Sequence, residues 1–431
     1  MKGSESGPGP DASEHPRPPH RWLLMGSLIL AGESIYMLPY MRKSFQTSME
    51  STFGLTAFEV GTLNALFGVL ALVSYLPGGW LADRFSARRL LTLSLLATGT
   101  GGLYMATLPD YTGLLLVHAF WGIFAICTFW AALIKATRLW SPADAQGRAF
   151  GILDGGRGLV GAVLASAAAF AFGLSATVEG GLVNVIAIYS LAALFAGVAV
   201  WTLVPDDHET YAEHSPGHHG IHVFDSIVQT ARRPEVWLMT VVIFCAYLMF
   251  LGSYDFPAYA ERGFEQTKEF GAWLGAFRDW LRPAAAIAAG VIADRVSPAR
   301  ATSVLFAALA VGWTSLALLP PSASTIAILG TQVAVVAVAI FALRGIYFAL
   351  LEQSRIPLHL TGVAVGVISM LAYTPDIFAA MLSGWLVDTQ PGTTGYRIYF
   401  GIMAGAAVAG MAAAVAIGVR SGRATAVNAN A

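Results

Sequence analysis

Long apolar stretches alternate with short polar connections along almost the whole chain. A helix rises about 1.5 Å per residue and the hydrocarbon core of a bilayer is about 30 Å thick, so a membrane span needs about 20 residues. Twelve stretches of the 431-residue sequence reach that length. They cover approximately residues 22–42, 57–82, 88–108, 112–139, 146–173, 180–204, 234–258, 269–293, 299–319, 324–352, 361–387 and 395–419. The pattern predicts an all-α membrane protein with twelve transmembrane helices.

One polar phrase occurs twice, each time between two apolar stretches. The copies are Gly79-Trp-Leu-Ala-Asp83-Arg84-Phe-Ser-Ala-Arg88 and Gly290-Val-Ile-Ala-Asp294-Arg295-Val-Ser-Pro-Ala-Arg300. Asp83 and Asp294 stand 211 positions apart, about half the chain. Internal duplication on this scale is typical of secondary transporters, so we expect two pseudo-symmetric six-helix bundles and the movement of a solute.

The two bundles imply five segments: a tail at 1–21, a first bundle at 22–204, a linker at 205–233, a second bundle at 234–419 and a tail at 420–431. The first tail is rich in proline and lacks the apolar core of a signal peptide, so we expect it to be disordered and the first helix to remain as an anchor. The linker holds five histidines, but their spacing defines no metal geometry, so we interpret it as a solvated connection.

Composition narrows the classes of function. Hydrophobic residues make up 56% of the chain and charged residues 12%, while the formal net charge of −1 gives no reason to expect nucleic acid as a partner. The chain has two cysteines, and it lacks the phosphate-loop, zinc-protease and nucleophile-elbow motifs. We therefore expect no enzyme activity, no cofactor, no metal and no disulfide. Because one twelve-helix chain can enclose a complete path, we expect a functional monomer.

Basic residues crowd into alternate connections between the apolar stretches. Arginines follow the second, fourth, sixth, eighth, tenth and twelfth stretches, whereas the opposite connections hold Arg262, Lys268 and Arg397. By the positive-inside rule, both termini should be cytoplasmic.

Charged residues inside the spans are costly, which makes their positions informative. The third, sixth, ninth and twelfth stretches carry none in their interiors, so these helices should face lipid. Near the estimated midplane of the others lie Glu33, Arg157, Arg278, Asp279, Arg282, Arg344 and Asp376. We expect them to line or border a central polar cavity between helices 1, 2, 4, 5, 7, 8, 10 and 11.

Two of these arginines, Arg278 and Arg282, stand one helical turn apart and should project to one face, a geometry suited to gripping an anion. Asp279 could neutralise one of them in the empty site or take a coupling proton. The alternative is a permanent buried ion-pair network with Asp376 or Glu33 that only holds the bundles together.

The helix count and the repeated phrase resemble the major facilitator superfamily over residues 22–419. In that family the phrase helps to close the cytoplasmic side, so the resemblance implies gating roles for Asp83, Arg84, Arg88 and Asp294. Lys135 and Glu352 occupy equivalent positions in the two halves, which favours a cytoplasmic contact between them. For Arg88, the alternative is that it only fixes the orientation of the chain in the membrane. For Lys135, the alternative is that its side chain extends to the lipid headgroups.

The fifth stretch reads Asp154-Gly-Gly156-Arg157-Gly158-Leu-Val-Gly161. It matches a dinucleotide-binding fingerprint only formally, because no strand precedes it. We expect these glycines to allow tight helix packing and to leave room around Arg157. The run is similar to the glycine-rich fifth helix of nitrate and nitrite carriers, without their asparagine.

The segment Tyr36-Met-Leu-Pro-Tyr-Met-Arg42-Lys43 resembles organophosphate:phosphate antiporters, whose arginine there binds substrate phosphate. The resemblance makes Arg42 a candidate substrate ligand, although a place near the end of the helix also suits an interfacial anchor. Phe250 stands where those antiporters carry their second phosphate-binding arginine, which argues against simple phosphate exchange. Asp279 matches an acid of the antiporters, and residues 129–154 resemble a neighbouring bacterial permease branch.

Four basic and three acidic midplane residues favour an anionic organic solute: a sugar phosphate, a sugar acid or another carboxylate. We expect transport across the bacterial inner membrane by alternating access, coupled to protons. The candidate anion ligands are Arg42, Arg157, Arg278, Arg282 and Arg344. The candidate walls are Tyr36, Trp130, Tyr247 and Tyr373, and the candidate proton carriers are Glu33, Asp279 and Asp376. The alternatives are a nitrate-type inorganic anion carrier and a transporter-like sugar-phosphate sensor.

Overall fold

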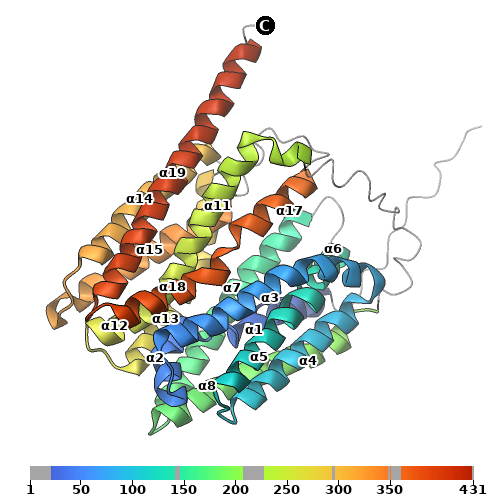
Figure 1. Ribbon diagram of the computed structural model, residues 1–431. Helices are drawn as coiled ribbons and strands as arrows, with labels where there is room; N and C mark the ends of the chain where they lie inside the picture. The colour runs from blue at the N-terminus through green and yellow to red at the C-terminus, as the bar shows by residue number, and fades with distance from the viewer. Residues whose placement is uncertain are drawn as a thin grey trace, which may run out of the picture.

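The computed structural model describes residues 21–140, 146–206, 228–293, 297–347, 350 and 361–429, and the secondary structure of this part of the chain is helical (Figure 1). Ten of its helical stretches are long and apolar enough to span a membrane by length and composition. The fold class predicted from the sequence, an all-α membrane protein, is confirmed.

The first half consists of α1 (Arg21–Met37), α2 (Arg42–Phe53), α3 (Ala57–Arg84), α4 (Ala87–Met105), α5 (Tyr111–Ile123), the π-helix η1 (Phe124–Thr128), α6 (Trp130–Trp140), α7 (Gln146–Gly173) and α8 (Val178–Leu203). The second half consists of α11 (Pro234–Gly252), the short 3-10 helix η3 (Ser253–Asp255), α12 (Phe256–Gly263), α13 (Lys268–Ala293), α14 (Pro298–Leu318), the 3-10 turn η4 (Ala323–Thr325), α15 (Ile326–Ile346), α17 (Thr361–Ala372), α18 (Pro375–Thr389) and α19 (Thr394–Ala429). Each predicted span corresponds to one helix or to two helices separated by a short break. The last helix continues to Ala429, beyond the end expected at 419.

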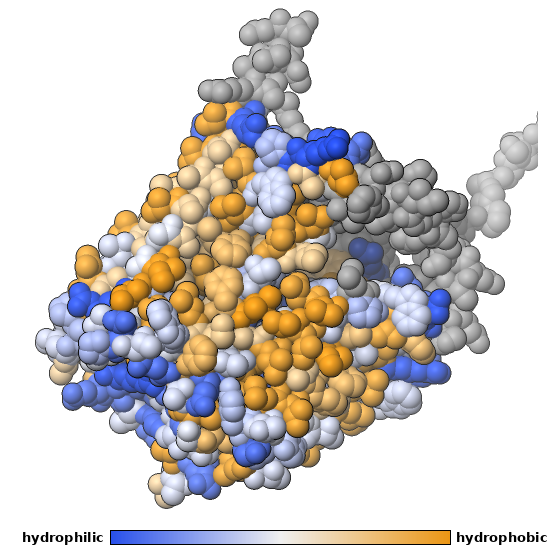
Figure 2. All heavy atoms as spheres, in the orientation of Figure 1, coloured by the Kyte–Doolittle hydropathy of each residue, from blue (hydrophilic) through white to orange (hydrophobic). Residues whose placement is uncertain are grey.

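Each half has its own apolar core. Trp121, Phe129 and Tyr189 are buried in the first half, and Phe256 and Trp313 in the second. Large apolar side chains are also exposed along α4, α8, α14 and α19, the four helices expected to face lipid. Figure 2 shows apolar residues over much of the outer surface. A membrane protein needs such a surface because lipid surrounds it.

The breaks in the helices place polar groups in the middle of the bundle. Pro39 lies between α1 and α2, and its carbonyl accepts a hydrogen bond from Asn64 Nδ2 (2.9 Å). Pro375 begins α18, which puts Asp376 in the first helical turn. Proline interrupts the helical hydrogen-bond pattern, and a helix N-terminus stabilises a carboxylate. The broken spans therefore supply local positions for charge inside the membrane.

The two ends of the bundle differ. We call them the Asp388 end, where α2 and α18 end and α3 begins, and the Arg88 end, where α3 ends and α4 and α11 begin. At the Asp388 end, α2, α12 and α18 gather (Figure 1). The backbones of α3 and α18 touch there, because a Cβ atom at Gly61 would lie 2.5 Å from the Ala380 oxygen. Figure 2 shows a recess between the halves toward the Arg88 end. The bundle is therefore closed at the Asp388 end.

Candidate functional site

Charged residues from both halves meet in the middle of the bundle. They come from α1, α2, α7, α13, α15 and α18, together with η3. These residues form three groups, which differ in how completely their charges are paired.

The first group joins α1, α7 and α13. Glu33 lies 3.6 Å from Arg157 Nε and 3.5 Å from Arg282 Nη1. Arg157 Nε also donates to the Gly32 carbonyl (2.9 Å). Asp154 accepts from Arg282 Nη2 (3.0 Å) and lies 3.9 Å from Arg157 Nη1. Two arginines from opposite halves thus share two carboxylates.

The glycines of α7 make this group possible. A Cβ atom at Gly161 would lie 2.7 Å from Glu33 Oε1, and one at Gly156 would lie 2.5 Å from Ile29 of α1. Near Gly158, the nearest atoms belong to the Arg282 side chain, at 3.3 Å. These contacts agree with the expectation of close packing and room for charged side chains in this helix.

The second group surrounds Asp279 and is almost completely buried. Asp279 accepts from Lys43 Nζ (2.8 Å) of the first half and from Arg278 Nη2 (2.7 Å). Arg278 Nη1 donates to the Ser253 carbonyl (3.2 Å), and its guanidinium lies 4.7 Å from the Tyr254 ring centre. Arg278 and Arg282 therefore join different groups, although they stand one turn apart on α13.

Arg42 belongs beside this group rather than at a membrane surface. It is 3% exposed, donates to Gln46 Oε1 (2.8 Å) and lies 3.7 Å from Asp255. Asp255 also accepts from the Ser383 hydroxyl (2.6 Å). Arg42 thus bridges the two halves and already has a carboxylate partner.

The third group contains Asp376 and Arg344. Asp376 accepts from the Tyr40 hydroxyl (3.0 Å) of the first half and from the Tyr247 hydroxyl (2.7 Å) of the second. Arg344 lies 4.0 Å from the Phe250 ring centre and 5.5 Å from that of Tyr247. Its Nη1 is buried and has no hydrogen-bond partner among the described residues. Arg344 also forms no ion pair with any of these described residues. In this respect it differs from Arg42, Arg157, Arg278 and Arg282.

The predicted aromatic walls lie beside these charges. Arg157 is 5.8 Å from the ring centres of both Tyr36 and Trp130. The Tyr247 and Tyr373 rings meet edge to face with centres 4.7 Å apart. The structure therefore places each of these four aromatic residues beside a charged group or another wall residue.

The predicted gating residues that the structure describes lie at the Arg88 end. Asp83 and Arg84 are exposed, and Arg84 lies 4.3 Å from the Trp80 ring centre. Arg88 pairs with Asp206 (2.6 Å), and Lys135 Nζ donates to the Ala82 carbonyl (3.1 Å) at the end of α3. These contacts stay within the first half. Asp294 and Glu352 lie outside the described residues, as do the histidines of the linker.

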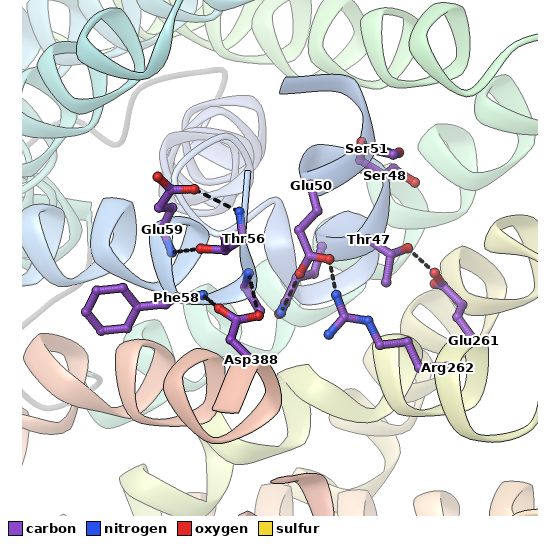
Figure 3. A network of polar contacts seen from close by, with 12 residues as sticks. Thr47, Ser48, Glu50, Ser51, Thr56, Phe58, Glu59, Glu261, Arg262 and Asp388 are labelled. Carbon is purple, nitrogen blue, oxygen red and sulfur yellow. Dashed lines mark hydrogen bonds and ion pairs between the residues drawn. The ribbon is translucent and has the colours of Figure 1, made fainter. Parts of the chain in front are cut away.

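The Asp388 end has polar contacts of its own, which join the halves (Figure 3). Asp388 of α18 accepts from the backbone N–H groups of Ala57 (3.2 Å) and Phe58 (2.7 Å), at the N-terminus of α3. Arg262 of α12 pairs with Glu50 of α2. The first turn of α3 has free N–H groups and a partial positive charge, so a carboxylate from the other half is a favourable cap.

Several residues of these groups were not predicted from the sequence: Tyr40, Asp154, Tyr254, Asp255, Glu50, Arg262 and Asp388. Asp154 and Asp255 stand within predicted spans, where an isolated acid is a signal by itself. Tyr40 and Asp388 had no such signal, because their partners are 336 and more than 300 residues away in the chain.

Comparison with known families now adds to this geometry. The family model for the Major Facilitator Superfamily matches residues 23–375. The chain belongs to this superfamily. It is therefore a multi-pass secondary transporter rather than an enzyme, as expected from the duplication.

Two relatives of this chain come from Escherichia coli (strain K12). Inner membrane protein YihN is 26% identical over 398 residues, which cover 92% of this chain and 94% of the relative. Inner membrane protein YqcE is 26% identical over 384 residues, which cover 88% and 90%.

Solved transporter structures share the fold. The nucleoside transporter NupG has a TM-score of 0.70 at 14% identity, covering 92% of this chain and 98% of that one. The D-xylose-proton symporter has a TM-score of 0.69 at 15% identity, covering 92% and 96%. A bacterial homologue of the lysosomal transporter Spinster, in an inward-facing and unoccupied conformation, has a TM-score of 0.70 at 14% identity, covering 94% and 97%.

Proposed function

We propose that this protein moves a small organic anion across the bacterial inner membrane, coupled to protons. The observation that carries the proposal is the state of Arg344. It is the arginine of the central groups that has no carboxylate partner among the described residues, and one of its donors is buried without a hydrogen bond. A buried guanidinium nitrogen without a hydrogen bond is costly, so an anionic ligand that accepted from it would stabilise it.

Two further arginines support an anion site near Arg344. Arg282 and Arg157 both lie beside the carboxylate of Asp154, and α15, which carries Arg344, packs against α13, which carries Arg282. These three arginines come from α13, α7 and α15, and hence from both halves. A ligand between them would contact both halves, which is the arrangement that alternating access requires.

Arg278 and Arg42 fit this role less well. Their side chains are only 2% and 3% exposed, whereas those of Arg157 (13%) and Arg282 (22%) are partly exposed. We therefore assign them to the framework that holds the site, and we assign substrate contact to Arg157, Arg282 and Arg344.

Asp376 is the candidate that we favour for the coupling proton. Protonating Asp279 would leave Lys43 and Arg278 without their counter-charge, and protonating Glu33 would leave Arg157 and Arg282 with one carboxylate fewer. Asp376 is held by two neutral tyrosine hydroxyls, one from each half. Its protonation would break no hydrogen-bonded ion pair and would change a contact between the halves.

The aromatic rings favour an organic rather than an inorganic anion. Phe250, Tyr247 and Tyr373 stand beside Arg344 and Asp376, where they can pack against a ring or a carbon chain. A site for nitrate alone would have little use for this apolar wall.

We also infer that the Arg88 end faces the cytoplasm and that both termini lie there. Exposed arginines gather at this end. Of the three basic residues predicted for the opposite loops, Arg262 and Lys268 are engaged in contacts between the halves. The names of the two relatives agree with an inner-membrane location.

The proposal is tested by binding and flux with the purified protein. Melting temperatures in detergent would be compared with glucuronate, glucose 6-phosphate, nitrate, phosphate and glucose, because a ligand of the native state raises thermal stability. We expect an organic anion to stabilise the protein and to enter proteoliposomes that contain it. Arg344→Ala should lose both effects, whereas Arg300→Ala, which removes an exposed arginine at the start of α14, should keep them.

Stabilisation by glucose that persists in Arg344→Ala would contradict the proposal. Stabilisation by nitrate alone would favour the inorganic-anion alternative. Binding of glucose 6-phosphate without flux in liposomes would favour the sensor alternative.

A further inference from the structure

Asp154 occupies an unusual position for a carboxylate in a transporter core. Its side chain is 64% exposed, yet it lies on α7 within the candidate membrane span Arg148–Gly173 and faces arginines from both halves. Arg282 Nη2 donates to Asp154 Oδ1 at 3.0 Å, and Arg157 Nη1 lies 3.9 Å from the same oxygen. One carboxylate oxygen thus lies beside two of the three proposed anion ligands.

Glu33 provides a comparison, because it pairs with the same two arginines. Its side chain is only 9% exposed, and its Oε1 lies so near the α7 backbone that a Cβ atom at Gly161 would be 2.7 Å away. The side chain of Asp154 is 64% exposed, so it has more open space around it than Glu33. Glu33 is therefore wedged between helices, whereas Asp154 has room to move away from Arg282.

The charges explain why an exchangeable acid is useful. Without Asp154, Arg157 and Arg282 would share Glu33 alone, and Arg344 on the adjacent α15 has no carboxylate partner among the described residues. Like charges in a medium of low dielectric constant repel strongly, so the empty site would be unfavourable. An anion that entered the site would replace one carboxylate contact by another.

We propose that Asp154 is a displaceable internal counter-ion: it neutralises Arg282 and Arg157 while the site is empty, and the anionic group of the substrate takes its place. This inference rests on the proposed function and adds a residue that sets affinity and selectivity. A neutral solute offers no charge in exchange for Asp154, so it is excluded. The net free energy of binding an anion is the difference between its own contacts and the Asp154 contacts that it replaces, so the anion can also leave the site.

The exchange also bears on movement of the two halves. The ion pair between Arg282 and Asp154 joins α13 of the second half to α7 of the first. Displacing Asp154 transfers that connection to the substrate. The substrate then bridges the halves in place of a side chain that always belongs to one of them.

The test compares Asp154→Asn with Asp206→Asn. Asp206 is the matched control because it also pairs with two arginines, Arg88 (2.6 Å) and Arg89 (3.1 Å), but lies outside the central groups. Dissociation constants for glucuronate and glucose 6-phosphate, and melting temperatures with and without each anion, would be measured on the full-length protein in detergent.

We expect Asp154→Asn to lower the dissociation constant about threefold to tenfold, because the competing carboxylate is gone. The melting temperature of the ligand-free variant should fall, and the shift produced by the anion should increase. Asp154→Glu, which keeps the charge, should restore the affinity of the wild type. Asp206→Asn should leave the dissociation constant unchanged.

A higher dissociation constant in Asp154→Asn would mean that Asp154 contacts the ligand directly, and it would overturn the inference. An unchanged dissociation constant with a lower melting temperature would also overturn it, since the ion pair would then be static. Failure of both anions to bind the wild type and the variant would instead reject the proposed anion site itself, and the counter-ion role with it.

Discussion

Asp388 and Asp154 are both carboxylates that join the two halves, and they differ in the groups that donate hydrogen bonds to them. Asp388 accepts from two backbone N–H groups at the start of α3, next to closely packed helices. Asp154 accepts from the end of an arginine side chain and remains largely exposed. The first arrangement suits an end that stays closed until the halves move. The second suits a contact that a solute can replace.

The Asp279 group differs from both of these carboxylates in its cationic partners and in its burial. Asp279 has two cationic partners and almost no access to solvent. Buried ion pairs are costly to break because the remaining partner keeps an uncompensated charge. The contacts between the halves are therefore of three kinds. In order of decreasing cost to break, they are the buried Asp279 group, the closed Asp388 end and the exchangeable Asp154 pair.

The largest effect is expected for Asp279→Ala. It would leave Lys43 and Arg278 buried without their shared carboxylate, so the free energy of unfolding should fall by roughly 3–5 kcal/mol. Chemical denaturation of the detergent-solubilised protein would measure it. The double variant Lys43→Met, Asp279→Ala should recover part of the loss. A stable Asp279→Ala protein that had lost only proton coupling would show that Asp279 is a proton carrier and that the framework role is wrong.

The next effect concerns Asp376→Asn, which removes the proposed proton carrier. For one proton moved with each solute, a gradient of one pH unit supplies about 1.4 kcal/mol, or tenfold accumulation. In proteoliposomes, the variant should exchange solute across the membrane but should no longer accumulate it against a gradient. Accumulation equal to that of the wild type would exclude Asp376 from coupling. Asp206→Asn serves as the control that removes a carboxylate elsewhere.

A smaller effect is expected at the closed end for Asp388→Ala. The N-terminus of α3 would lose its cap from the other half, and such a contact contributes about 0.5–2 kcal/mol. Opening of the Asp388 end should therefore become several-fold more frequent. Distances between spin labels at Phe58→Cys, whose side chain is exposed, and Gln390→Cys, in a background without Cys127 and Cys245, would report it. Thr56 and Glu59 form a separate cap within the first half, so Thr56→Ala should weaken α3 without the same opening.

The smallest effect is expected for Asp206, which lies just beyond α8 at the Arg88 end. The nearby Ser86 hydroxyl and the hydrogen bonds from Arg89 and Arg88 lower the pKa of Asp206 to about 2, from 3.8. The folded state is therefore stabilised above about pH 4, and this contribution is lost as the pH falls toward 2. The melting temperature of Asp206→Asn should lie slightly below that of the wild type at pH 6, and the two should converge near pH 2. A difference that persisted at pH 2 would show that the carboxylate charge is not its source.

Part of the site could be predicted from the sequence because charge inside an apolar span is costly wherever the span packs. Glu33, Arg157, Arg282, Arg344 and Asp376 were recognised on this ground alone. Spacing along a helix was less informative. Arg278 and Arg282 were expected to act together because four residues make one turn, yet one pairs with its neighbour Asp279 and the other with acids of α1 and α7.

The sequence by itself determined the helices, the duplication and which of the spans hold charge. Length and apolarity decide whether a segment crosses a bilayer, and both are local properties. Only the tertiary structure decided which charges are paired, which end is closed and which arginine lacks a carboxylate partner among the described residues. These depend on how α1, α7, α13 and α15 are rotated against one another, and on contacts such as Tyr40 with Asp376 that join residues 336 positions apart. No local pattern records such a pairing, because its energy arises only when the halves pack.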